Sequence, residues 1–144
     1  GAALARRARN GSRRMSSVEN IPVQVNELHG NVRPILFEVL HALDTLLDEE
    51  TPTTIDLASL PFGPGELDSL QAQLGHGELE ARLDSLGNSL IYETTYPGVW
   101  WIEHRNVNDE IVGRYLEVTR LPDILSSQTA DMKVGYARLE EQLK

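Results

Sequence analysis

The side chains best suited to metal chemistry lie close together near the start of the chain. Glu38, His41 and Asp44 are three residues apart, and side chains at this spacing converge on one face of a helix. A Glu-x-x-His pair is a ligand pattern of di-metal carboxylate proteins, which carry a second copy on another helix. Here only one copy exists, and His41 lies at the centre of the polar face. A charged outer helix surface is the better interpretation, and we expect no metal site.

The other three histidines are also better explained by structure than by chemistry. His29 borders the apolar arc of the same predicted helix, which favours packing or hydrogen bonding. His76 lies between two glycines and is typical of a turn residue. His104 closes a predicted strand, and we expect a hydrogen-bonded structural role for it.

The stretch "FGPGE", residues 62–66, invites comparison with a phosphate-binding turn before a helix. Such a cradle needs consecutive free backbone N–H groups at the helix N-terminus. Pro64 removes one of them, and Glu66 places a negative charge where the phosphate would lie. We therefore interpret the stretch as a turn that starts a helix. Because the chain also has no Cys and no GxSxG, SxxK or HExxH motif, we expect neither catalytic residues nor a cofactor.

Charge is divided unevenly along the chain and disfavours nucleic acid as a partner. Five of the 13 basic residues lie in the first 14 positions, and the remainder carries 8 basic and 22 acidic residues, a net charge of −14. So acidic a body is repelled by phosphate backbones. The basic opening lacks the apolar segment of a secretory leader, so the cytoplasm is the default location. No apolar run approaches the roughly 18 residues of a membrane-spanning helix, and we expect no membrane insertion.

Hydrophobic periodicity predicts the elements that position these residues. Apolar side chains recur at helical spacing through 28–50, where Asn31 is a plausible N-cap and Pro34 falls in the first turn. A second helix is predicted over 63–77, with Pro64 in its first turn and Gly75 as its stop. Two short helical stretches are expected in the tail, 121–144. Strands are predicted at 53–57, 78–83, 89–96, 99–105 and 111–119.

The order of these elements predicts an α+β fold. The last four strands are joined by connections too short for crossover helices, so they should pair antiparallel. We expect a single domain with a mostly antiparallel sheet of four to five strands, helices packed on one face, and the order α-β-α-β-β-β-β-α. The domain should span 27–144, after a disordered basic extension at 1–20.

The two tryptophans are adjacent in the strand "VWWIEHR", so they must point to opposite faces of the sheet. Trp101 shares a face with Glu103 and Arg105, and this face looks solvated. Trp100 shares the other face with Ile102, which we assign to the core below the long helix. Trp101 is then an outward aromatic residue, and Trp101→Ala should leave the melting temperature nearly unchanged. Its cover is either the tail or a neighbouring tyrosine, or else a partner protein. Alternatively, a bulge in the strand would exchange the two tryptophans between the faces.

Several stretches together resemble the C-terminal domain of the HupH/HyaF/HoxQ hydrogenase-expression proteins, over roughly residues 27–133. "TTIDLxSLPxxPGE" and "PGVWW" are the most distinctive. The stretches are "TTIDLASLPFGPGELDSL", "LGHGELEARL", "ETTYPGVWWIEHRN" and "YLEVTRLPDIL".

The resemblance implies a non-enzymatic accessory protein, or chaperone, in the maturation of NiFe hydrogenase. Its expected partner is a hydrogenase subunit precursor, with the small iron–sulfur subunit favoured, or another maturation protein. The alternatives are a metal-handling or hydrolytic enzyme and a structural homodimeric domain. Family members are often about twice as long, and a one-domain chain could replace their second half by a homodimer. The expected contact residues are Pro97, Gly98, Trp100 and Trp101, with Pro61 and Phe62 second.

Overall fold

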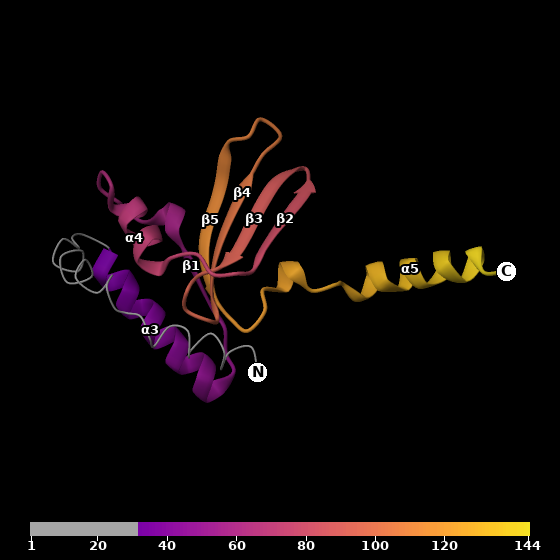
Figure 1. The fold of residues 1–144 in the computed structure, drawn as a ribbon, viewed down its shortest axis with the longest axis horizontal. Helices are drawn as coiled ribbons and strands as arrows, with labels where there is room; N and C mark the ends of the chain where they lie inside the picture. Colours follow the sequence, from indigo (N-terminus) through magenta and orange to yellow (C-terminus); the bar gives the residue numbers. More distant parts are fainter. Residues whose placement is uncertain (1–31) are drawn as a thin grey trace.

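The computed structural model describes residues 32–144, where five strands form one antiparallel sheet (Figure 1). Helices α3 and α4 lie on one side of the sheet, and α5 leaves on the other. The α+β class and the order of elements are thereby confirmed. The expectations for 1–20, His29 and Asn31 fall outside the described residues. The elements are α3 (Val32–Glu49), β1 (Thr53–Asp56), the 3-10 turn η2 (Leu57–Ser59), α4 (Glu66–Leu74), β2 (Glu80–Ser85), β3 (Gly87–Glu93), β4 (Val99–Arg105), β5 (Ile111–Val118), the 3-10 turn η3 (Asp123–Leu125) and α5 (Thr129–Gln142).

The sheet has the strand order β1-β5-β4-β3-β2. Strands β2 to β5 form a meander, in which each strand pairs antiparallel with the next. β1 returns to the edge beside β5, where Ile55 lies opposite Leu116. No described helix is long and apolar enough to cross a membrane.

Helix α3 packs against the sheet through fewer of its apolar residues than the sequence predicted. Its charged side, with Glu38, His41 and Asp44, faces solvent as expected. Leu40 and Leu47 belong to the expected apolar arc, yet 59% and 72% of their surfaces are exposed. A helix contacts a sheet along one line, so residues on the shoulders of a wide apolar arc remain uncovered. The buried residues of α3 are Val32, Ile35, Val39, Ala42 and Leu46.

Helix α4 begins later than expected. Its N-cap is Gly65, which has a φ of 77°, so Pro64 precedes the helix rather than lying in its first turn. The Glu66 carboxylate accepts the Gly63 N–H at 2.7 Å, an arrangement that satisfies a free backbone donor at the start of the helix. The helix stops at Gly75 as expected, with a φ of 69° and an N–H bond to the carbonyl of Gln71.

Both faces of the sheet carry an apolar cluster, and both tryptophans are buried. Trp101 is 0% exposed and belongs to the main core under α3 and α4, where it stacks on Tyr92. Trp100 is 3% exposed and lies on the opposite face in a smaller cluster with Ile91 and Ile102. The expected outward Trp101 and helix-covered Trp100 were therefore wrong, because the two faces are exchanged.

The polar residues after Trp101 explain the error. Glu103 lies on the face of the main core, where its carboxylate accepts hydrogen bonds from the Trp101 indole at 3.0 Å and from Arg114 at 3.1 Å. A charged pair between neighbouring strands β4 and β5 thus borders the core without exposing the whole face. His104 shares a hydrogen bond of 2.7 Å with Ser89, as expected for a hydrogen-bonded histidine at the end of the strand.

The segment after β5 covers the second cluster and then leaves the sheet. The Trp100 indole donates to the carbonyl of Thr119 at 3.0 Å, and Leu125 of η3 packs against the same cluster. The Arg120 guanidinium binds both carboxylate oxygens of Glu50 at 2.8 Å and lowers the pKa of that carboxyl. Helix α5 then projects away from the body (Figure 1), and none of its residues is buried. The two expected helical stretches of the tail are confirmed, and the cover of Trp100 comes from within the chain.

Candidate binding site

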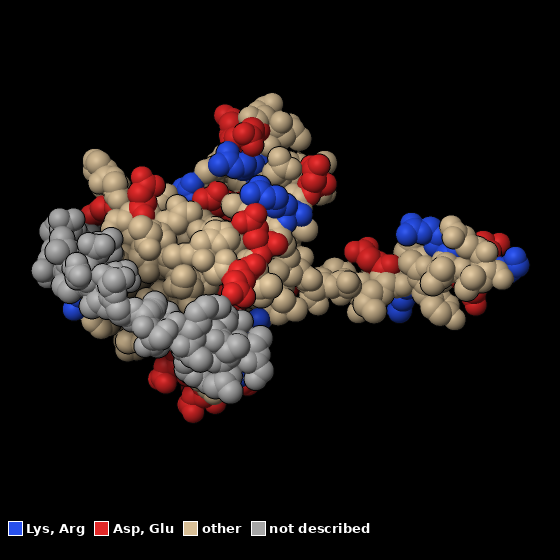
Figure 2. Space-filling view, in the orientation of Figure 1, with Lys and Arg blue, Asp and Glu red and all other residues tan. Residues whose placement is uncertain are grey.

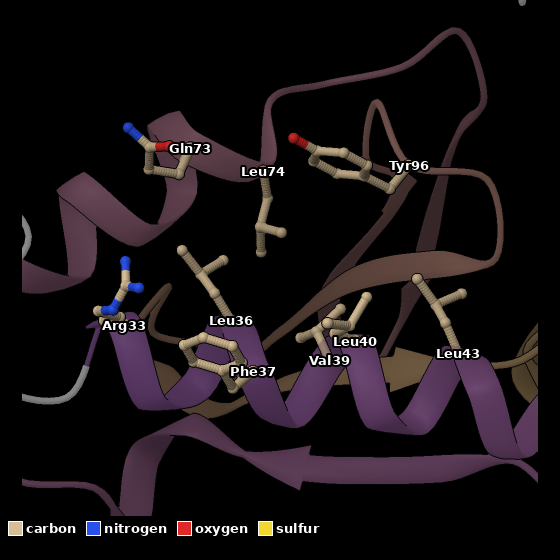
Figure 3. Close-up of a pocket in the computed structure, with 9 residues that line it drawn as sticks. All are labelled: Arg33, Leu36, Phe37, Val39, Leu40, Leu43, Gln73, Leu74 and Tyr96. Atoms are coloured by element: carbon tan, nitrogen blue, oxygen red, sulfur yellow. The ribbon is translucent and has the colours of Figure 1, made fainter. Parts of the chain in front are cut away.

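An apolar groove of about 290 Å³ lies between α3, the end of α4 and the turn from β3 to β4 (Figure 3). Leu36, Phe37, Leu40 and Leu43 of α3 form one wall. Leu74 of α4 and Tyr96 of the turn lie opposite them in the close-up. The groove is lined by Arg33, Leu36, Phe37, Val39, Leu40, Leu43, Gln73, Leu74 and Tyr96.

The apolar wall follows from the width of the α3 arc. Leu36, Leu40 and Leu43 lie beside the buried stripe of α3, on the side that faces the groove. Phe37 lies farther from the stripe, on the same side of the helix. Phe37 and Leu40 are both exposed. Large apolar side chains that gather on a surface are typical of binding sites. The sequence indicated part of this wall, because the predicted apolar arc of α3 has more leucines than one line of contact can bury. It did not indicate Phe37, which lies outside that arc.

The opposite wall is fixed by hydrogen bonds between α4 and the turn. The carbonyl of Leu74 accepts two of them, from the Thr95 N–H at 3.0 Å and from the Thr95 hydroxyl at 2.8 Å. The Tyr96 N–H donates to the Thr94 hydroxyl oxygen at 3.1 Å. Because the turn is tied to α4 in this way, Tyr96 is held at the rim, and the groove is largely pre-formed.

The charges around the groove are distributed along α3. Arg33 lies at one end, with its guanidinium 5.1 Å from the centre of the Phe37 ring, a cation–π arrangement. Towards the other end of α3, Asp44, Asp48 and Glu49 are exposed acids. The groove therefore offers apolar contact along its length, with a basic residue near the N-terminus of α3 and acidic residues near its C-terminus.

A second hollow, of about 350 Å³, lies beside α4 around His76 and Tyr92. The His76 ring stacks on Tyr92 at 3.9 Å and bonds Glu80 at 2.9 Å. Gln71 donates to the Tyr92 hydroxyl, and burial raises the pKa of that phenol. Among the polar side chains that line this hollow, Gln71 and Tyr92 bond each other, and His76 bonds Glu80 outside it. Within residues 32–144, no three His, Asp or Glu side chains are grouped to hold a metal ion.

The expected contact residues are divided between surface and core. Pro97 is exposed and Gly98 half-buried in the turn that carries Tyr96, and of this turn only Tyr96 lines the groove. Trp100 and Trp101 are buried in the two apolar clusters. Pro61 is exposed and Phe62 packs partly against the main core, in the connection between η2 and α4. Neither of these last two lines the groove.

The stretch "PGVWW" is explained by the structure of this turn. Gly98 has a φ of 90°, a conformation that strains any residue with a Cβ. Its N–H donates to the Glu93 carboxylate at 3.0 Å, and its carbonyl accepts the Thr119 N–H. The next strand then sends one tryptophan into each apolar cluster. These residues hold the turn in place, and Tyr96 and Pro97 are its exposed part.

This chain resembles known proteins that belong to one family. The family model described as "HupH hydrogenase expression protein, C-terminal conserved region" matches residues 30–144. The chain is 31% identical over 113 residues to the hydrogenase expression/formation protein HoxQ of Azotobacter vinelandii and 32% identical to HupQ of Azotobacter chroococcum. Each alignment covers 77% of this chain and 40% of the relative. The chain therefore spans well under half the length of these curated relatives.

A solved structure agrees with the sequence matches. The hydrogenase expression protein HupH from Thiobacillus denitrificans superposes with a TM-score of 0.76 at 39% identity. The superposition covers 79% of this chain and 95% of that one. The shared fold thus includes most of the residues that form the sheet and its helices.

Proposed function

Because the chain belongs to the family of HupH hydrogenase expression proteins, we propose that it acts as a non-enzymatic chaperone in NiFe hydrogenase maturation. In this proposal it holds a hydrogenase subunit precursor before assembly, and the small iron–sulfur subunit is the favoured client. The resemblance seen in the sequence is confirmed at the level of the family. The observation that carries the proposal is the exposed apolar groove between α3 and α4.

The groove suits an apolar segment of a subunit that has not yet been assembled. Such a segment exposes side chains that become buried in the finished enzyme. Each large aliphatic or aromatic side chain that moves from water into an apolar site gains about 1.5–3 kcal/mol. Leu40 and Phe37 present this kind of surface on a helix, and Tyr96 adds an aromatic ring with a polar tip. A peptide segment in helical form would match the groove best.

Absence of thiols suits the favoured client. The chain has no Cys, whereas an iron–sulfur cluster is ordinarily held by cysteine thiolates. A cysteine-free surface neither competes for the cluster nor forms mixed disulfides with the client. We place the encounter in the cytoplasm, before the subunit is exported.

The proposed contact surface includes the turn beside the groove. Pro97 would extend the rim beyond Tyr96, and Gly98 would set its position through its backbone. Trp100 and Trp101 would contribute from below, by anchoring β4 to both apolar clusters. Pro61 and Phe62 form a second proposed contact, outside the groove.

A pair of leucine variants on one helix tests the proposal. Leu40 lines the groove and Leu47 does not, although both are exposed on α3. Tagged chains with Leu40→Asp or Leu47→Asp would be recovered from hydrogenase-expressing cells, and the small-subunit precursor measured by immunoblot. We expect Leu40→Asp to lose the precursor and Leu47→Asp to retain it. Equal recovery with the two variants would show that the groove is not the client site.

A further inference from the structure

Helix α5 carries an apolar stripe that none of the described residues, 32–144, covers. Met132, Tyr136, Leu139 and Leu143 follow one another at steps of four, three and four residues, so they share one face of the helix. Between 60% and 78% of each side chain is exposed. Helical propensity alone does not account for this helix, because a helix of 14 residues is marginal in water without packing. We therefore expect another surface to pack against this stripe and to stabilise the helix.

The α5 helix of the same chain does not reach the groove on α3. Pro122 is buried, and Leu125 packs against the cluster of Trp100 on the opposite side of the sheet from α3. Only residues 126–128 separate η3 from α5, and three extended residues span about 10 Å. This reach equals about the spacing between two packed layers. To arrive at the groove of its own chain, α5 would have to pass around the edge of the sheet and then along α3, which is farther. Figure 1 shows α5 directed away from α3.

We propose that the α3/α4 groove of each chain receives α5 from a second copy, so that two chains exchange their C-terminal helices. Both surfaces are apolar, and each lacks a partner within the described residues. Anchor residues at i, i+4 and i+7 on α5 match the way in which an amphipathic helix occupies a groove. Reciprocal exchange makes the two contacts identical, so the assembly closes as a dimer.

The helix dipoles favour an antiparallel orientation of α5 against α3, and opposite charges can pair in this orientation. Arg33 lies near the start of α3, and Asp44 and Asp48 lie near its end. Helix α5 has the same order, with Lys133 near the start and Glu140 near the end. Figure 2 shows acidic and basic side chains next to one another along α5. Antiparallel docking brings Glu140 to Arg33 and Lys133 to the acids of α3, and it also opposes the two helix dipoles favourably.

The exchange gives the groove a resting occupant. In the free protein α5 would close the groove, and a client would bind by displacing it. This last consequence rests on the proposed function, but the dimer does not, because both surfaces belong to the chain itself.

A disulfide experiment tests the exchange cleanly because the chain has no Cys. Leu40→Cys and Tyr136→Cys would be made in separate full-length chains, mixed, oxidised and run on a non-reducing gel. We expect a cross-linked dimer from this mixture. We expect none from Tyr136→Cys mixed with Leu86→Cys, which lies exposed in the turn between β2 and β3. Cross-linking of Tyr136→Cys with itself alone would instead show pairing of α5 with α5, and would overturn the proposal.

Light scattering gives an independent readout. The wild-type chain should have about twice its mass of 16.1 kDa. Leu139→Glu, on the stripe, should return it to the monomer, and Leu86→Glu should leave it dimeric. A wild-type monomer, or a dimer that survives Leu139→Glu, would refute the exchange. Both experiments use the purified chain without hydrogenase, so their failure is separate from failure of client binding.

Discussion

Replacement of Trp101 by alanine should destabilise the protein severely. The indole is fully buried in the main core, lies 6.4 Å from the Tyr92 ring centre and donates its N–H to Glu103 at 3.0 Å. An alanine leaves a cavity between the sheet and the helices. It also removes one of the two hydrogen bonds that the Glu103 carboxylate receives, although Arg114 remains as a partner.

The size of the effect follows from the burial. Truncation of a buried Trp to Ala costs about 3–5 kcal/mol. Complete unfolding of a domain costs about 5–15 kcal/mol, so this single change removes a large part of the stability. For a domain of this size the melting temperature should fall by about 10 °C or more.

Thermal unfolding followed by far-ultraviolet circular dichroism measures this effect without relying on the deleted fluorophore. Leu86→Ala is the control, because it also truncates a large apolar side chain but at an exposed position outside the groove, where changes usually stay within about 0.5 kcal/mol. A Trp101→Ala protein that melts at the wild-type temperature would show that Trp101 is not in the core.

Two further substitutions test the structure of the sheet. Gly87→Ala should destabilise the protein, because the glycine has a φ of 120° and an added Cβ would clash with the carbonyl oxygen of Arg105; an unchanged urea midpoint would contradict the close approach. Burial, with a contribution from Asp123, raises the pKa of Glu117 above 4.5, so the folded protein holds this proton more tightly than the unfolded chain does. The associated stability is present below pH 4.5 and is lost as the pH rises through the raised pKa. We expect Glu117→Gln to be more stable than wild type at neutral pH and to flatten this loss in urea unfolding, whereas an unchanged pH profile would contradict the assignment.

Local patterns were sufficient to predict the elements and their order. The strand "VWWIEHR" has the bounds expected from its sequence, and Gly75 ends α4 through its positive φ. The antiparallel meander followed from connections too short to cross the sheet. These features depend on residues close together in the chain, which is why one sequence suffices for them.

Features that depend on distant residues were not predictable in the same way. The alternation of side chains along a strand correctly predicted that Trp100 and Trp101 lie on opposite faces of the sheet. Which tryptophan lies on which face depended on where α3 packs and on how the tail folds back. Glu103 suggested solvent, although it is half-buried and bound by Trp101 and Arg114. The exposure of Leu40 likewise depends on how much of the α3 arc the sheet and α4 cover. The groove is a product of this tertiary geometry.

The most direct test of the proposed function is binding between purified components. The affinity of the chain for a small-subunit precursor would be measured by titration, beside its Leu40→Asp and Leu47→Asp variants and with the large subunit as comparison. We expect binding of the small-subunit precursor, weakened about 10- to 100-fold by Leu40→Asp, which corresponds to loss of one buried leucine. Leu47→Asp should bind like wild type. Equal affinity of all three proteins, or no binding of the precursor to the wild-type chain, would contradict the assignment of the groove as a client site.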